Sequence, residues 1–244
     1  MTLASVIYRL HVWAGAILGV QMFIWLLSGV AISWLDRDIV QGERSAFLAP
    51  AQELDAKGYA SPGGVIAQVE GATTVTLRHH LGRPAYQVNH AEGASLFDAD
   101  TGRLISPIDA SSIRKIAGRD FVGDGEIKSV SLVDNPPKEY RGRRPIWRVT
   151  FDDRINTRLY ISPETGLIAA RRNDTWRTYD IFQMLHFLDF QGRGEINNPV
   201  ARMVTLGALA FAASGFIMFC FEKPRRYLAA DLSAIAERLT SKKQ

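Results

Sequence analysis

Residues 12–35 read VWAGAILGVQMFIWLLSGVAISWL, a run of 24 residues without a charged side chain. A second run, residues 203–221, reads MVTLGALAFAASGFIMFCF and is uncharged over 19 residues. A helix needs about 20 apolar residues to cross the hydrocarbon core of a bilayer, so each run is long enough to span it. The sequence therefore predicts an α+β membrane protein in which two transmembrane helices flank a folded domain.

The first apolar run is too long for a cleaved signal peptide. The apolar part of such a peptide has about 7–15 residues and leads into a small-residue cleavage site. Here the run is followed by Asp36, Arg37 and Asp38. We therefore expect the run to stay in the protein as a membrane anchor.

Basic side chains are concentrated at the two ends of the chain. Residues 36–202 carry 22 basic and 22 acidic side chains, so the net charge of +4 arises outside them, from Arg9 and from the segment after the second run. Lysine and arginine close to a helix end favour the cytoplasmic side. Both termini are therefore expected in the cytoplasm of a bacterial cell and the central domain in the periplasm. This topology explains the basic pI of 9.3 without nucleic-acid binding.

Five segments follow from this pattern. They are a first transmembrane helix with a short cytoplasmic N-terminus (1–36), a periplasmic domain (37–178), an interfacial helix and loop (179–200), a second transmembrane helix (201–222), and a basic amphipathic cytoplasmic tail (223–244). The interfacial assignments rest on apolar residues at helical spacing beside the expected crossings, with packing against the central domain as the alternative.

The central domain is expected to contain short strands at 73–80, 85–90 and 95–105, separated by Gly or Pro. Ser61, followed by proline, and Asp109 are each expected to begin a helix. Residues 159–168, LYISPETGLI, resemble residues 96–105, LFDADTGRLI. A strand, an acidic Thr-Gly turn and a second strand thus occur twice, which indicates a weak internal repeat.

His11 lies at the inner edge of the first run, and Gly15 and Gly19 follow it at intervals of four residues, so all three share one helix face. In one interpretation the glycines let another helix approach closely. In the other, the histidine ligates haem iron and the glycines leave room for a flat porphyrin. These residues alone leave both interpretations open.

His186, in MLHFLDF before the second run, is the other candidate haem ligand, with an interfacial or capping role as the alternative. His79 and His80 are adjacent in an expected strand, so their side chains point to opposite faces and do not share a metal. We expect these two and His90 to be solvated. The single cysteine, Cys220, excludes cysteine-held iron–sulfur clusters and C-x-x-C-H haem attachment in the domain.

Arginines gather at positions 141, 143, 144, 148, 171 and 172. Such a group can hold carboxylates, phosphates or haem propionates. The simpler interpretation is a solvated loop balanced by Asp152 and Asp153. No Walker, G-x-G-x-x-G, H-E-x-x-H or G-x-S-x-G sequence is present.

Five stretches together resemble one known family. They are RLHVWAG at 9–15, LSGV at 27–30, MLHFLDF at 184–190, INN at 196–198 and ASG at 213–215. The chain resembles the PepSY-associated transmembrane proteins, and its central domain resembles the PepSY module with its acidic Thr-Gly turns. Larger relatives have four crossings and bind two b-type haems, and are similar to reductases of ferric siderophores. The resemblance implies His11 as a cytoplasmic-side ligand and His186 as a periplasmic-side ligand of haem b.

Helix geometry separates these two ligands. A 24-residue crossing is about 36 Å long at 1.5 Å per residue, so His11 and His186 cannot bind one iron from opposite faces. A two-fold homodimer would supply a second copy of each, which predicts two haems per dimer. Met218 is an alternative second ligand on the inner side.

Two classes of function therefore remain. The first is a haem-dependent ferric reductase or electron carrier that serves iron uptake. It would act on ferric iron or a ferric siderophore, with a quinol or a cytoplasmic reductase as electron donor. The alternative is a cofactor-free, membrane-anchored PepSY module that binds or inhibits a periplasmic partner such as a peptidase.

Overall fold

A computed structural model of the chain describes residues 3–47, 53–54, 58–190 and 198–222, with the backbone alone for 3–10 and 218–222. The chain is α+β and divides into two compact units. One consists of residues 35–179, called here the sheet unit. The other combines residues 1–34 with residues from 180 onward and is called the helical unit. The basic amphipathic tail expected at residues 223–244 lies outside the described residues.

Long helices build the helical unit. They are α1 (Leu3–Trp34), the second half of α5 (Asp174–Phe187) and α6 (Pro199–Glu222). In α1 the segment His11–Trp34 and in α6 the segment Pro199–Ile217 are long and apolar enough to cross a membrane.

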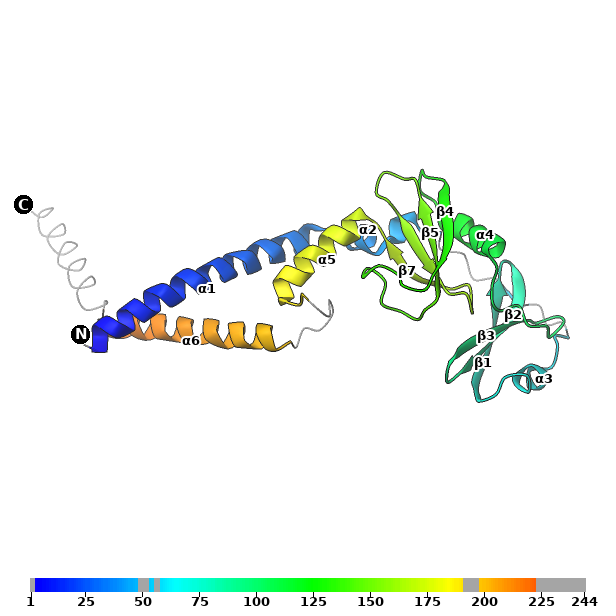
Figure 1. Cartoon of the computed structure of the whole chain (residues 1–244), viewed down its shortest axis with the longest axis horizontal. Helices are drawn as coiled ribbons and strands as arrows, with labels where there is room; N and C mark the ends of the chain where they lie inside the picture. The colour runs from blue at the N-terminus through cyan, green and yellow to red at the C-terminus, as the bar shows by residue number, and fades with distance from the viewer. Residues whose placement is uncertain (1–2, 48–52, 55–57, 191–197, 223–244) are drawn as a thin grey trace, which may run out of the picture. The chain divides into compact units, whose positions relative to one another are not determined.

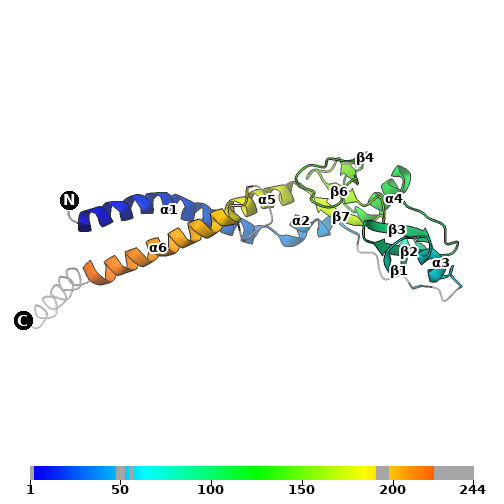
Figure 2. The ribbon, with the colours of Figure 1, turned by 60° about the horizontal axis from the view of Figure 1, so that its bottom comes forward.

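Figures 1 and 2 show α1 and α6 side by side. The pair is antiparallel, because Gly15 lies against Phe211 whereas Leu18, further along α1, lies against the earlier residue Gly207. The glycines allow this approach: a Cβ atom added to Gly15 would lie 3.0 Å from the Phe211 ring. Close helix packing through small residues is common where apolar helices associate.

Two antiparallel sheets and short helices make up the sheet unit. The helical elements are α2 (Arg37–Gln41), the 3₁₀ turn η1 (Glu43–Ser45), α3 (Pro62–Ile66) and α4 (Ala110–Asp120). The first sheet has the order β1 (Ala72–His80), β2 (Arg83–His90), β3 (Gly93–Asp98). The second has the order β4 (Ile127–Val133), β5 (Ile146–Phe151), β6 (Arg158–Ile161), β7 (Ile168–Arg172).

Each sheet buries one face under a helix. Val65 of α3 packs with Tyr86, Val88 and Phe97 of the first sheet. Ile113 of α4 belongs to the main core, which joins residues of both sheets. The buried members of that core are Ala85, Leu96, Ile108, Ile113, Ala117, Val149, Phe151, Leu159 and Ile161. Alternating apolar residues along β2 and β5 produce this arrangement, because successive side chains of a strand point to opposite faces.

The internal repeat expected from the Thr-Gly turns is present in the structure. Gly102 (φ 68°) and Gly166 (φ 70°) both adopt the left-handed conformation that favours glycine. Each donates its backbone N–H over 2.8 Å to the carbonyl four residues earlier, at Asp98 and Ser162. The side chains of Asp98 and Ser162 also accept backbone N–H groups within their turns. A helix followed by an antiparallel sheet therefore occurs twice in the chain, with three strands the first time and four the second.

The expected helix starts are found with different capping. Asp109 caps α4 by accepting the N–H groups of Ser111 and Ser112, as its position in the sequence predicted. Ser61 precedes Pro62 of α3 but makes no side-chain capping bond. Helix α5 begins at Asp174, five residues before the expected position 179. It ends at Phe187, and Leu188 then takes a positive φ of 53°.

Candidate cofactor site

His11 of α1 faces α6 in the helical unit. Its ring stacks on Phe211 with 4.4 Å between centroids, and its Nδ1 atom lies 2.9 Å from Ser214 Oγ. A Cβ atom added to Gly215 would lie 3.5 Å from the His11 ring, so the missing side chain there makes room for the imidazole. Three positions of α6 thus fix the orientation of this ring.

The partners of Ser214 determine the tautomer of His11. Ser214 donates its single hydroxyl proton to the carbonyl of Phe211, over 2.7 Å. Its oxygen must then accept from His11, which places the imidazole proton on Nδ1. The Nε2 atom carries a lone pair and has no hydrogen-bond partner among the described side chains. His11 is therefore held in the form that can ligate a metal through Nε2.

His186 of α5 is held against the other end of α1 in the same way. Its Nδ1 atom lies 3.2 Å from the carbonyl of Trp25 and 3.1 Å from Ser28 Oγ. A carbonyl only accepts, and Ser28 donates its own proton to the carbonyl of Ile24, so Nδ1 of His186 carries the proton. Nε2 again has no partner in the described part of the chain. A Cβ atom added to Gly29 would lie 3.3 Å from the His186 ring.

The two imidazoles lie at opposite ends of α1. His186 contacts Ser28, which follows His11 by 17 residues, a distance of about 25 Å along a helix. Each histidine is therefore a separate site. Within the described residues no group of three or more His, Cys, Asp and Glu side chains gathers around either one. A metal ion at either site therefore needs most of its ligands from a prosthetic group or from another chain.

A cavity of about 390 Å³ opens beside His11, lined by small or apolar residues of α1 and α6 that include Ala14, Leu18, Gly207 and Ala210. The two glycines singled out on α1 differ in their surroundings. Gly15 is covered by Phe211, which fits the helix-association interpretation. No atom lies within 4 Å of a Cβ atom added to Gly19, so its surface is open.

The residues present fit an axially ligated haem. Each site offers one imidazole, and a hydrogen-bond acceptor beside the ring nitrogen that does not bind the metal is the usual arrangement for a metal-bound histidine. A tetrapyrrole would supply the four ligands that the protein does not. The backbone of Met218 belongs to α6, but its side chain lies outside the described residues.

Two expectations about the sheet unit were wrong. His79, His80 and His90 are half-buried rather than solvated. Burial, and next the charge of Arg78, lower the pKa of His80. Arg141, Arg143 and Arg144 are exposed, as the solvated-loop interpretation predicted, but the carboxylates of Asp152 and Asp153 accept from the N–H groups of Glu126 and Thr157. Arg171 instead pairs with Asp120, and Arg143 donates to the carbonyl of Glu92.

Sequence patterns did not reveal the serines that orient the histidines. Ser28 is 158 residues from His186 and Ser214 is 203 residues from His11, so no local spacing connects them. In retrospect, each serine directly precedes a glycine, in Ser28-Gly29 and Ser214-Gly215, and each pair contacts one imidazole. A Ser-Gly pair on the helix that faces each histidine was therefore the sequence feature that could have indicated these contacts.

No family model, no curated protein and no solved structure matches the chain.

Proposed function

We propose that this chain is an inner-membrane electron carrier that holds b-type haem through His11 and His186 and reduces ferric iron on the periplasmic side. The observation that carries the proposal is that both imidazoles, at opposite ends of α1, have Nδ1 within 3.1 Å of a serine hydroxyl and have no hydrogen-bond partner for Nε2 among the described residues. One such histidine is ordinary. Two with the same arrangement, each beside a Ser-Gly pair, support a shared chemical role.

The exposure of apolar side chains in the helical unit supports a membrane location. Only 6% of the apolar segment of α1 and none of that of α6 is buried inside the described structure. The core helix of a water-soluble protein would be mostly buried. These helices instead expose apolar side chains such as Ile17, Phe23 and Leu209. A bilayer, with the central domain in the periplasm and both termini in the cytoplasm, covers such a surface.

In this proposal Ser214 and Ser28 keep the two histidines in the ligating tautomer, and Phe211 fixes the plane of the His11 ring. A bound haem supplies reversible one-electron exchange between Fe(III) and Fe(II), with a potential set by ligand, burial and hydrogen bonding. The cavity beside His11 is lined mainly by apolar side chains of α1 and α6. The open surface at Gly19 and the cavity beside His11 provide room next to the inner ligand.

A homodimer completes both sites in this account. Because the two histidines of one chain are about 25 Å apart along α1, a second axial ligand must come from another copy or, on the inner side, from Met218. Two donors on the same face of α1, Gln21 Nε2 and Trp25 Nε1, are buried and have no partner among the described residues. An unpaired donor in hydrocarbon costs several kcal/mol.

The remaining parts of the proposal rest on the resemblance to PepSY-associated transmembrane proteins. They are ferric iron or a ferric siderophore as acceptor, a quinol or a cytoplasmic reductase as donor, and a role in iron uptake. Basic residues at the ends of the chain agree with that orientation.

Anaerobic mixing with ferric citrate tests the reductase activity without knowledge of the donor. Purified protein is first reduced with dithionite and desalted. We expect ferric citrate to return its visible spectrum to the oxidised form, with one Fe(II) formed per electron lost, as measured with a ferrous-specific chelator. Gallium(III) citrate, which has the same charge and does not accept an electron, is the matched control and should leave the reduced spectrum unchanged.

A reduced protein that ferric citrate does not reoxidise would remove iron reduction from the proposal. A protein without visible absorption would favour the cofactor-free module that binds a periplasmic partner.

A further inference from the structure

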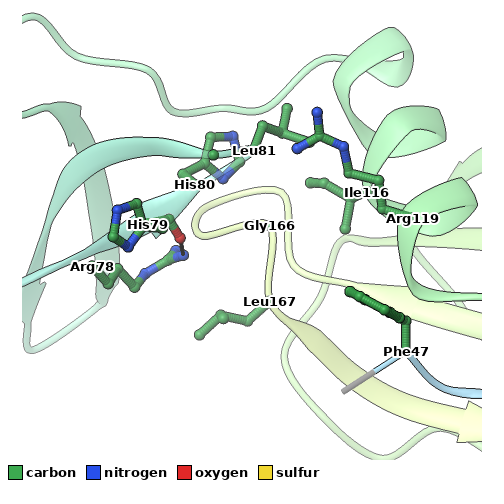
Figure 3. A pocket seen from close by; sticks show the side chains of 10 residues that line it. Phe47, Arg78, His79, His80, Leu81, Ile116, Arg119, Gly166 and Leu167 are labelled. Carbon is green, nitrogen blue, oxygen red and sulfur yellow. Dashed lines mark hydrogen bonds between the residues drawn. The ribbon is translucent and has the colours of Figure 1, made fainter. Parts of the chain in front are cut away.

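The sheet unit contains a cavity of about 700 Å³ that is lined by four separate parts of the chain, of which Phe47, after η1, is the first (Figure 3). Arg78, His79 and His80 come from the end of β1, Ile116 and Arg119 from α4, and Leu167 from the turn before β7. Volumes of about 300–1,000 Å³ are typical of small-molecule sites. The candidate haem ligands belong to the other unit, so this cavity is independent of them.

Arg78 brings a positive charge to this cavity without a carboxylate partner in the described residues. Its Nε atom donates to Gln87 Oε1 over 2.9 Å, and its Nη1 and Nη2 atoms donate to the carbonyls of His79 and Thr165. All three acceptors are neutral. The side chain is half-buried, and burial lowers the pKa of Arg78, although a guanidinium stays protonated in proteins. An unneutralised, partly desolvated cation attracts an anion.

Arg119 adds a second cation at the opposite wall. Its Nη1 atom lies 3.8 Å from the position of a Cβ atom added to Gly82, in the turn after β1, so its side chain reaches across from α4 (Figure 3). Its neighbour Asp120 does not neutralise it, because that carboxylate forms a two-bond ion pair with Arg171. In the described structure no ion pair is formed by Arg119 itself. Its five N–H groups are therefore available to a ligand.

Apolar side chains cover the rest of the cavity. Leu167 and Phe47 are about half exposed, at 48% and 52%, and Ile116 lies beneath Gly166. Gly166 contacts His80 and Ile116 so closely that a Cβ atom there would lie 2.9 Å from each. No acidic side chain is among the described residues that line the cavity. The site thus combines two cations with an apolar floor.

We infer that this cavity binds a small organic anion that carries carboxylate groups on an apolar or aromatic body. Arg78 and Arg119 form charge-assisted hydrogen bonds with the carboxylates. Phe47, Ile116 and Leu167 cover the apolar body, and His80 offers a neutral ring nitrogen at the edge. Inorganic phosphate satisfies the cations but leaves the apolar surface in water, so it binds more weakly.

Calorimetric titration of the full-length protein in a non-ionic detergent tests this inference with benzene-1,3-dicarboxylate as the probe. We expect it to bind, benzamide not to bind, and phosphate to bind at least tenfold more weakly. Arg119→Gln should weaken binding of the dicarboxylate about tenfold, the loss expected for a charged hydrogen bond. Arg114→Gln, an exposed arginine of α4 outside the cavity, is the matched control and should leave the affinity unchanged.

Three results would overturn the inference: no binding of the dicarboxylate, equal binding of benzamide, or equal losses in the two arginine variants. Equal binding of phosphate would remove the apolar part of the ligand class. Arg119 is exposed, so its variant should fold, which a thermal unfolding curve checks. None of these readouts depends on haem.

Discussion

Replacing His11 by alanine is expected to remove about half of the haem from the purified protein, and His186→Ala the other half. Each variant deletes one axial ligand, and the two ligands are about 25 Å apart on α1, so loss at one end should leave the other intact. The measurement is haem content per chain after extraction, compared with the unaltered protein. The double variant should be colourless.

His90→Ala is the matched control for these variants. His90 is a half-buried histidine of β2 whose nearest polar contact is Ser95, at 3.5 Å. It lies in the sheet unit and should leave the haem content unchanged. Full haem content in both the His11 and the His186 variants would exclude them as ligands. Loss of all haem in either single variant would instead mean that the two sites depend on each other.

Glu139→Ala is expected to have the largest effect on stability in the sheet unit. Glu139 is 8% exposed and accepts hydrogen bonds from Arg158 at 3.0 Å, Arg177 at 2.8 Å and Tyr160 at 2.7 Å. Removing the carboxylate leaves the partly buried Arg158 and the buried hydroxyl of Tyr160 without their acceptor, and leaves Arg177 with Asp174 alone. Loss of one member of such a group costs about 3 kcal/mol of unfolding free energy.

Thermal or urea unfolding followed by tryptophan fluorescence measures this change. Glu70→Ala removes an exposed carboxylate and should shift the unfolding free energy by less than about 0.5 kcal/mol. Equal effects of the two substitutions would show that the arginine–carboxylate network contributes nothing to stability.

The same network predicts how stability depends on pH. Burial pushes the pKa of Glu139 upward, but the hydrogen bonds from Arg177, Tyr160 and Arg158 outweigh it, and the pKa lies below its ordinary value. A carboxyl with a lowered folded-state pKa stabilises the protein above its unfolded pKa of about 4.3. That contribution is lost as the pH falls through the folded pKa. Glu139→Gln should therefore flatten the acid limb of the stability profile.

Much of this architecture could be predicted from local sequence. Hydropathy is a local property, so the two apolar runs predicted α1 and α6 directly. The Thr-Gly turns at Gly102 and Gly166 predicted the repeat, because the left-handed backbone there requires glycine. Asp109 predicted the start of α4, because an aspartate caps a helix by accepting backbone N–H groups two and three residues later.

Other features depend on contacts between distant positions and gave no local signal. Glu139 stands among loop residues in the sequence, and its burial follows only from the positions of Arg158, Tyr160 and Arg177. The expected solvation of His80 failed because the turn at Gly166 folds against it, 86 residues later in the chain.

The visible spectrum of the purified, unaltered protein tests the central claim most directly. If two imidazoles hold haem b, dithionite should produce the sharp α and Soret bands of a six-coordinate b-type haem, with a haem-to-chain ratio of one and a detergent-corrected mass of a dimer. A colourless protein from haem-sufficient cells, or a coloured monomer with one haem site, would contradict the account.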